Sequence, residues 1–437
     1  MQGVAPGAVR EDGEDEMLLG VIADDMTGAT DVALMLNRSG MRTVQVIGVP
    51  REEAALPEAD CVVVALKSRT NPVEEAVADS IAACEALLKA GAKQILFKYC
   101  STFDSTAKGN IGPVADALMQ RLDTDRAIVC PAFPANGRSI YQGYLFVGPL
   151  PLHESSMKDH PLTPMRDSSL VRLMEAQSAH EVGLVDYATV LEGTGAVRKR
   201  FDALAAAGRR YIVTDALTNA DLTTLGEAVA DHKLLTGGSG IAMGLPENFR
   251  KAGALPQREA PQEIKAPEGR AGIISGSCST ATRGQIKAAL EAGFPALKVD
   301  PLALVSGEQT AEKLAAWALE QPADNPFLLY SSDDPAEVAA VQEELGRERA
   351  GETVEQAFAE IARRIVAGGV SRLLVAGGET SGAVVQGLGI ATLEIGPEID
   401  PGVPWTRAVG GKELVIALKS GNFGAPNFFI KAWGLLR

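Results

Sequence analysis

Short apolar runs alternate with amphipathic patterns along most of this chain, and that alternation restricts its fold more than any other feature. The clearest runs are LLGVIA (18–23), CVVVAL (61–66), QILFKY (94–99), AIVCPAF (127–133) and YIVTDA (211–216). A helical pattern separates several of them, as in EEAVADSIAACEALLKAG, which ends at Gly91. Continuously apolar strands that alternate with helices are typical of a mostly parallel sheet covered on both faces. The sequence therefore predicts an α/β protein.

The alternation stops in the proline- and charge-rich stretch GALPQREAPQEIKAPEGR (253–270), which we interpret as a linker. Strand-like runs resume beyond it, as in AGIISGS and SRLLVAGGETSG. We expect two domains, at 17–252 and 271–437, each a mostly parallel sheet flanked by helices. Residues 1–16 are acidic and lack the apolar core of a signal peptide, so we expect a disordered tail there.

The composition argues against several classes of protein. The net charge of −15 disfavours broad binding to nucleic acid or to an anionic membrane. The five cysteines are far apart and form no CxxC pair, so neither a zinc site nor a disulfide framework is expected. No apolar run approaches the roughly 18–20 residues that span a bilayer. We therefore expect a cytoplasmic protein with reduced thiols.

Ligands of parallel α/β sheets bind at the carboxyl ends of the strands, so the residues after each run are site candidates. Asp24 and Asp25 follow the first run and suit a general base, an acceptor for a substrate hydroxyl or a water-mediated Mg²⁺ ligand. Alternatively, they cap the helix that Thr27 or Gly28 opens. Arg69 follows the second run and suits a two-pronged bond to a carboxylate, unless it belongs to a solvated basic loop.

The loop KYCSTFDSTAKGNIG follows the third run and is dense in hydroxyl groups. Ser101 and Thr102 suit a polyhydroxylated substrate, because each sugar hydroxyl both donates and accepts. Asp104 is placed to take the proton of an attacking hydroxyl, and Lys98 or Lys108 to neutralise an acid group or phosphate. The alternative is a Ser/Thr-rich turn that is stabilised by its own backbone.

Two further candidates follow the fourth run. Arg138, in PAFPANGRS, is a second potential anion-binding residue. His160 precedes Pro161, so its backbone is expected to be extended, and a structural role is as plausible as a functional one.

The second half contains three turns of small residues, SGSCSTAT, AGGETSGAVV and LKSGNFG. Gly377, Gly378 and Gly421 allow the backbone to approach a ligand, and the helix starts beside these turns offer free N–H groups to phosphates. There is no Walker A loop, no protein-kinase motif set and no convincing GxGxxG after a strand. A phosphotransferase with this sequence would use an uncommon nucleotide site.

Seven segments, taken together and in order, resemble the four-carbon acid sugar kinase family. They read GVIADDMTGATDVA, KYCSTFDSTAKGNIGPV, HPLTPM, SGSCS, AGGETSGAVV, PGVPW and LKSGNFG. The resemblance extends from about Leu18 to the C-terminus, and the second and third segments are most similar to the branch that acts on 3-oxo-tetronate. Related members act on threonate or erythronate. Met26 stands where Phe or Leu is more usual, which affects packing more than chemistry.

The resemblance implies a substrate-binding domain at 17–252, a nucleotide-binding domain at 271–437 and an active site in the cleft between them. It implies ATP-dependent phosphorylation of the C4 hydroxyl of a sugar acid, with Mg²⁺ as the companion of ATP. Carried over by motif, Asp24, Arg69 and the loop from Lys98 to Asp104, with Ser101 and Thr102, would face the substrate. Asp25, Arg138 and His160, from the strand-end loops, complete the predicted substrate site. The ATP-facing residues would be Ser275, Ser277, Gly377, Gly378, Glu379, Thr380 and Gly421.

Several alternatives stay open at this point. Asp24 and Asp104 compete for the role of catalytic base, and the metal ligands are not assigned. A homodimer is compatible with the interpretation. A lyase or a dehydrogenase would turn over a sugar acid without ATP or with a nicotinamide, and a non-catalytic sugar-acid sensor would bind its ligand without consuming ATP.

Overall fold

The computed structural model describes residues 17–50, 56–160, 162–257, 264–411 and 413–436. The predicted tail at 1–16 and the central part of the predicted linker, 258–263, lie outside the described residues. No helix in the described ranges combines the length and the apolar character that crossing a bilayer requires.

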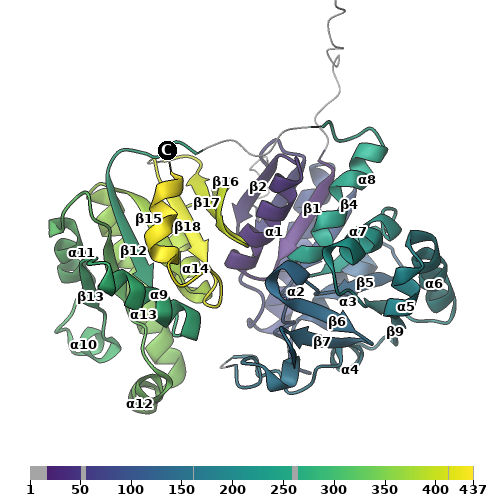
Figure 1. The fold of residues 1–437 in the computed structure, drawn as a ribbon, viewed down its shortest axis with the longest axis horizontal. Coiled ribbons are helices and arrows are strands. Elements are labelled where there is room, and N and C mark those ends of the chain that lie inside the picture. Colours follow the sequence, from purple (N-terminus) through teal and green to yellow (C-terminus); the bar gives the residue numbers. More distant parts are fainter. Residues whose placement is uncertain (1–16, 51–55, 161, 258–263, 412, 437) are drawn as a thin grey trace, which may run out of the picture.

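The N-terminal half is built on parallel strands with helices packed against them (Figure 1). In sheet order the strands are β2 (Thr43–Ile47), β3 (Cys61–Ala65), β1 (Leu19–Ala23), β4 (Gln94–Lys98), β11 (Leu234–Gly237), β5 (Ala127–Cys130), β10 (Tyr211–Thr214) and β9 (Val182–Val185). The helices are α1 (Met26–Arg38), α2 (Val73–Lys89), α3 (Ile111–Arg121), α4 (Leu170–Glu175), α5 (Tyr187–Leu191), α6 (Thr194–Ala206), α7 (Asn219–Ala228) and α8 (Pro246–Lys251). Every residue of β1, β3 and β4 is buried, which is why these segments read as unbroken apolar runs.

The C-terminal half repeats this plan and adds an antiparallel pair. Its parallel strands are β13 (Ala296–Lys298), β14 (Phe327–Tyr330), β12 (Arg270–Ser275), β15 (Val370–Ala376) and β18 (Val415–Lys419). The antiparallel strands are β17 (Val403–Ala408) and β16 (Thr392–Asp400). The helices are α9 (Thr280–Glu291), α10 (Pro301–Ser306), α11 (Ala311–Glu320), α12 (Pro335–Leu345), α13 (Arg347–Ala367), α14 (Gly378–Gly387) and α15 (Phe428–Lys431).

The two halves share one sheet, which corrects the expectation of a separate sheet in each domain. Strand β16 pairs antiparallel with β2, with Leu393 opposite Gln45, so the strands of the two halves named above form one continuous 15-stranded sheet. Figure 1 shows β16 and β17 reaching from the C-terminal half to β2. The pairing satisfies backbone groups of β2 that would otherwise form an exposed edge. It is invisible in the local pattern, because Gly396 and Pro397 interrupt the sequence of β16.

Smaller elements complete the fold. A three-stranded antiparallel sheet consists of β6 (Arg138–Tyr141), β7 (Tyr144–Val147) and β8 (Leu150–Pro151). Short 3-10 helices, written η, lie at η1 (Pro134–Asn136), η2 (Leu152–Glu154), η3 (Ser239–Gly244) and η4 (Ala432–Leu435).

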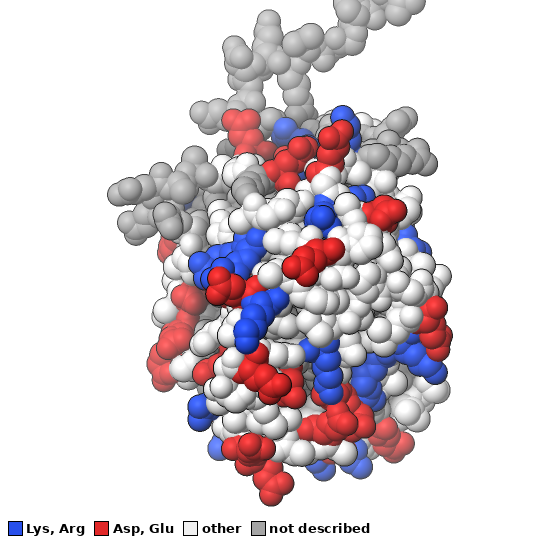
Figure 2. All heavy atoms as spheres, turned by 90° about the vertical axis from the view of Figure 1, so that its left-hand side faces the viewer, with Lys and Arg blue, Asp and Glu red and all other residues white. Residues whose placement is uncertain are grey.

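Acidic and basic side chains are interspersed on the face of the molecule shown in Figure 2. Many of the charged groups form local pairs, such as Lys298 with Asp333 and Arg364 with Glu360. Exposed pairs of this kind typically contribute about 0–1 kcal/mol each, so they add little to the stability of the fold.

Candidate active site

The register of three neighbouring strands brings the predicted acids and bases together. Ala23 at the end of β1 lies level with Ala65 on β3 and with Lys98 on β4. The Asp24 N–H donates to the Lys98 carbonyl at 3.0 Å, and the Asp24 carbonyl accepts from the N–H of Arg69 at 3.2 Å. The three segments that follow these strands are therefore held against one another by backbone hydrogen bonds.

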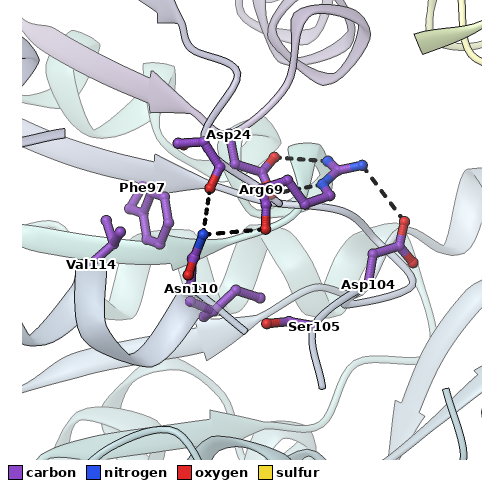
Figure 3. A pocket seen from close by; sticks show the side chains of 9 residues that line it. Asp24, Arg69, Phe97, Asp104, Ser105, Asn110 and Val114 are labelled. Carbon is purple, nitrogen blue, oxygen red and sulfur yellow. Dashed lines mark hydrogen bonds and ion pairs between the residues drawn. The ribbon is translucent and has the colours of Figure 1, made fainter. Parts of the chain in front are cut away.

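Arg69 forms the centre of a buried ion-pair cluster (Figure 3). Its Nε and Nη2 donate to the two carboxylate oxygens of Asp24 at 2.8 and 2.7 Å, and Nη2 also donates to Asp25 at 2.8 Å. Its Nη1 lies 3.6 Å from Asp104 Oδ2. Burial raises the pKa of Asp24, and the charge of Arg69 opposes that shift. The fork that we expected to bind a substrate carboxylate is thus occupied by carboxylates of the protein.

Asp25 fulfils the capping role that we named as the alternative for the acidic pair. Its Oδ1 accepts from the N–H of Gly28 at 3.1 Å, and its Oδ2 accepts from the Thr27 hydroxyl at 2.8 Å. Burial opposes ionisation of Asp25, but the charges of Arg69 and Lys98 outweigh it and lower the pKa. Asp25 therefore joins the start of α1 to the ion-pair cluster.

A small cavity of about 10 Å³ lies behind this cluster (Figure 3). Its lining residues are Asp24, Ser68, Arg69, Phe97, Asp104, Ser105, Asn110, Ile111 and Val114. Ser68 Oγ is buried and makes no hydrogen bond, while Asn110 Nδ2 donates to the Ser68 carbonyl at 2.8 Å. A space of this size is at the lower limit for a single water molecule and is too small for a substrate.

The hydroxyl-rich loop after β4 is a buried, tight turn. Phe103 and Asp104 both adopt left-handed backbone angles, with φ of 66° and 48°. Such angles are uncommon outside glycine and cluster at functional sites. The Thr102 hydroxyl donates to Asp104 Oδ1 at 2.7 Å, and the Ser105 hydroxyl donates to Gln177 at 3.0 Å. Side-chain hydrogen bonds therefore hold the loop, one within it and one to Gln177 outside it, and the loop directs Asp104 towards Arg69.

The remaining substrate candidates lie around a larger cavity of about 770 Å³. Lys98, Ser101, Thr102, Arg138 and His160 all contribute to its lining. His160 Nδ1 accepts from the N–H of Thr163 at 3.2 Å, and burial lowers the pKa of His160. Arg138 donates to the Asn136 carbonyl through Nη1, while its buried Nε makes no hydrogen bond.

The three small-residue turns of the C-terminal half converge on the same cavity. Ser277, Gly377, Gly378, Glu379, Thr380 and Gly421 line it. Two hydroxyls at the start of α9, those of Ser279 and Thr282, donate to the Gly421 carbonyl at 2.5 and 2.8 Å. Ser275 is different: it is fully buried and contacts Ser332 at 3.3 Å, outside the cavity lining. One cavity thus receives residues from the strand ends of both halves.

Family models match the two halves separately. Residues 19–245 match a sugar-binding N-terminal domain, and residues 273–429 match a nucleotide-binding C-terminal domain. The chain belongs to the four-carbon acid sugar kinase family. Among similar members, the 3-oxo-tetronate kinase of Cupriavidus necator is 56% identical over 95% of this chain and 96% of its own. The 3-oxo-tetronate kinase of Salmonella typhimurium is 47% identical over 95% of this chain and 98% of its own.

Solved structures of proteins with similar sequences share the fold of this sugar acid kinase. A Salmonella typhimurium LT2 protein, described provisionally as a tRNA synthase, superimposes with a TM-score of 0.84 at 45% identity. The match covers 96% of this chain and 99% of that protein. A Haemophilus influenzae protein matches with a TM-score of 0.75 at 44% identity, over 96% of this chain and 100% of its own.

Several residues in or next to the cavity of this sugar acid kinase were not among the predicted site residues. Lys67 forms ion pairs with Glu379 at 2.8 Å and with Glu355 at 3.5 Å, and so connects the two halves. Asp31 is buried on α1 and contributes to the cavity lining. Lys419, at the end of β18, is fully buried beneath the third turn. Of these three, only Lys67 carried a signal in the sequence, its position at the end of a strand-like run.

Proposed function

We propose that this chain is a 3-oxo-tetronate kinase, which transfers the γ-phosphoryl group of ATP to the C4 hydroxyl of 3-oxo-tetronate. The observation that carries the proposal is the similarity to proteins of that name, which are 44–56% identical to this chain over nearly its whole length. The products are ADP and 3-oxo-tetronate 4-phosphate. Threonate and erythronate are the alternative acceptors. The cytoplasmic location and the homodimer stay predictions.

Each half of the chain is assigned one of the two ligands. Residues 17–252 bind the sugar acid, residues 271–437 bind ATP, and 253–270 connect them. The cavity supports this assignment because it is lined by strand ends from both halves. In such a cleft the γ-phosphoryl group and the acceptor hydroxyl can meet, and closure would exclude water, which prevents wasteful hydrolysis of ATP.

Mg²⁺ is expected to accompany ATP, and the cavity offers suitable donors. No group of three or more metal-ligating side chains was found within the described ranges. Mg²⁺ bound to a nucleotide, however, needs only one or two protein carboxylates besides the phosphates. The carboxylates that line the cavity are Asp24, Asp25, Asp31, Asp104, Asp159 and Glu379. These donors fit the ion, which neutralises phosphate charge when it is bound.

Asp24 and Asp104 remain the proposed candidates for the catalytic base. Phosphoryl transfer depends mainly on positioning and charge neutralisation, so the base has a limited share of the rate. Removal of a general base typically lowers kcat by about 10²–10⁴. If Asp24→Asn and Asp104→Asn both retained kcat within about threefold of the wild type, neither residue would be the base.

The test is a coupled assay of ADP release with the purified chain and separate acceptors. We expect turnover with 3-oxo-tetronate and at least about tenfold lower kcat/KM with threonate and erythronate. Phosphorus NMR of the product should place the new phosphate on C4. Preferred turnover of threonate or erythronate would move the substrate assignment to those acids. Ligand binding without ADP release would identify a sensor and refute a kinase.

A further inference from the structure

One buried cation in the large cavity lies near several acids but, among the described residues, is bonded to none of them. Lys98 ends β4, is 3% exposed and contributes to the cavity lining. A Cβ atom built on Gly28 would lie 2.5 Å from Lys98 Nζ and 2.2 Å from Asp25 Oδ1. The ammonium group and the Asp25 carboxylate are therefore both packed against the Gly28 backbone, where no side chain fits.

Burial of the Lys98 ammonium group without a partner is energetically unfavourable, and an anionic ligand bound to it would offset that cost. Taking an ammonium group out of water costs several kcal/mol, which ion pairs and hydrogen bonds normally offset. Within the described ranges Lys98 Nζ takes part in no hydrogen bond or ion pair. Its charge nevertheless acts on the carboxyl groups of Asp24, Asp25 and Asp31, each of which it favours in the ionised form. Within the described residues the N–H donors of Lys98 therefore stay available to a ligand.

The other basic side chains of the cavity are already engaged. Arg69 binds Asp24 and Asp25, and Lys67 binds Glu379. Arg283 donates to the carbonyl of Cys278 at 3.0 Å, and Arg138 donates to the carbonyl of Asn136. Lys98 thus differs from every other Lys or Arg that lines the described cavity, because it keeps its full donor capacity for an incoming anion.

Lys98 lines the cavity together with the acids of the N-terminal half and the nucleotide turns of the C-terminal half. Asp31 follows Gly28 by one turn of α1, on the same face of the helix. A Cβ atom on Gly402 would lie 2.9 Å from Asp31 Oδ1 and 2.7 Å from the ring of Phe423. Phe423 belongs to the third turn, two residues beyond Gly421. Lys98 is therefore placed on the α1 face that extends from Asp25 to the nucleotide side.

We propose that Lys98 is a catalytic residue whose ammonium group binds the γ-phosphoryl group of ATP during its transfer. This inference rests on the proposed kinase activity. The C4 oxygen of the sugar acid forms the new bond to phosphorus while the bond from phosphorus to the β–γ bridging oxygen breaks. The electron pair of that bond leaves with ADP, and the hydroxyl proton passes to a cavity carboxylate. Lys98 keeps its proton and neutralises the non-bridging oxygens.

The experiment compares Lys98→Met with Lys89→Met, which alters an exposed lysine in the last turn of α2, outside the cavity lining. We expect Lys98→Met to lower kcat by about 10²–10³, the typical cost of losing a group that stabilises transition-state charge. The KM for 3-oxo-tetronate should stay within about threefold, and Lys89→Met should behave like the wild type. Calorimetry should show that Lys98→Met lowers the affinity for a non-hydrolysable ATP analogue by about tenfold or more relative to its effect on the affinity for ADP. Only the analogue carries a γ-phosphate.

A second variant guards against a folding defect. Gly28→Ala keeps the charge of Lys98 but displaces Nζ together with the Asp25 carboxylate, and we expect it to lower kcat by at least about tenfold. An increased KM for 3-oxo-tetronate with unchanged kcat in Lys98→Met would make Lys98 an anchor for the substrate carboxylate and overturn the proposal. Equal loss of affinity for ADP and the ATP analogue would also overturn it. Absence of turnover by the wild type would instead refute the kinase activity, and the calorimetric comparison would still test the contact with the γ-phosphate.

Discussion

Asp31 shows how packing changes the chemistry of a single residue. Its Oδ2 accepts from the Ser239 hydroxyl at 2.6 Å, while its Oδ1 is buried without a hydrogen-bond partner. Burial raises the pKa of Asp31 to about 6, although the charge of Lys98 opposes the shift. Nothing in the pattern of α1 distinguishes this aspartate, because its environment is created by Ser239, far away in the sequence.

This shift predicts a pH-dependent effect of Asp31→Asn on stability. The raised pKa means that the folded state binds the proton of Asp31 more tightly than the unfolded chain does. The stability that this proton contributes is fully present below the pKa of the unfolded chain, 3.8, and is lost as the pH rises through about 6. We expect the unfolding free energy of Asp31→Asn, relative to that of the wild type, to increase by about 3 kcal/mol as the pH rises from about 4 to about 7. Urea unfolding across that interval measures the difference. A difference that did not vary with pH would contradict the raised pKa.

Lys419 carries a second prediction at the residue scale. Its Nζ donates to the carbonyls of Ser420, Gly421 and Phe423 at 2.9, 3.0 and 3.1 Å. Lys419→Met would leave these carbonyls without a donor, at a cost of about 1–3 kcal/mol for each group that stays buried. We expect the Kd for ADP to rise by about tenfold or more, while binding of 3-oxo-tetronate changes little.

The matched control for Lys419→Met is Lys287→Met, since Lys287 is exposed on α9 and pairs only with Glu291. Calorimetric titration of both variants with ADP gives the comparison. If both variants bound ADP like the wild type, the third turn would not depend on Lys419.

At the scale of secondary structure, the local pattern predicted the central strands and several helices well. Strands β1, β3 and β4 lie within the predicted runs, and α2 lies within its predicted segment apart from its first residue. These elements are buried or amphipathic along their whole length, so their periodicity is clean. The antiparallel strand β16 was missed, because Pro397 and a register shift between Ile395 and Glu398 obscure its pattern.

The contact between α7 and η3 gives a prediction at this scale. A Cβ atom on Gly226 would lie 2.6 Å from the Gly244 Cα, and backbone atoms cannot yield as a flexible side chain does. We expect Gly226→Ala to lower the unfolding free energy by about 1–3 kcal/mol through overpacking. Gly195→Ala on α6 is the control, since no atom lies within 4 Å of its Cβ position. It should be neutral or stabilising by about 0.5–1 kcal/mol, and an equal effect of both changes would contradict the close packing.

At the scale of the whole molecule, the β2–β16 pair makes the two halves part of one sheet. Asn37 Nδ2 adds a hydrogen bond to the Ile395 carbonyl at 3.1 Å, and Lys67 adds its ion pair with Glu379. Contacts of this kind couple the stability of the halves, because unfolding of one exposes the strand edge and the apolar surface of the other.

This coupling predicts a single unfolding transition. The three tryptophans, Trp317, Trp405 and Trp433, all lie in the C-terminal half, so their fluorescence reports on that half alone. Far-UV circular dichroism reports on helices of both halves. We expect the urea unfolding curves from the two probes to coincide. Separated midpoints would show that the halves unfold independently in spite of the shared sheet.

The sequence by itself determined the α/β class, the strand ends at which the candidate residues lie, and the resemblance to the sugar acid kinases. These properties are encoded locally, in apolar periodicity and in short motifs that can be recognised without knowledge of the fold. Only the tertiary structure decided the single sheet, the ion pairs of Arg69 with Asp24 and Asp25, and the burial of Lys98 without a partner among the described residues. Pairing and burial depend on residues distant in the chain, so no local pattern contains them.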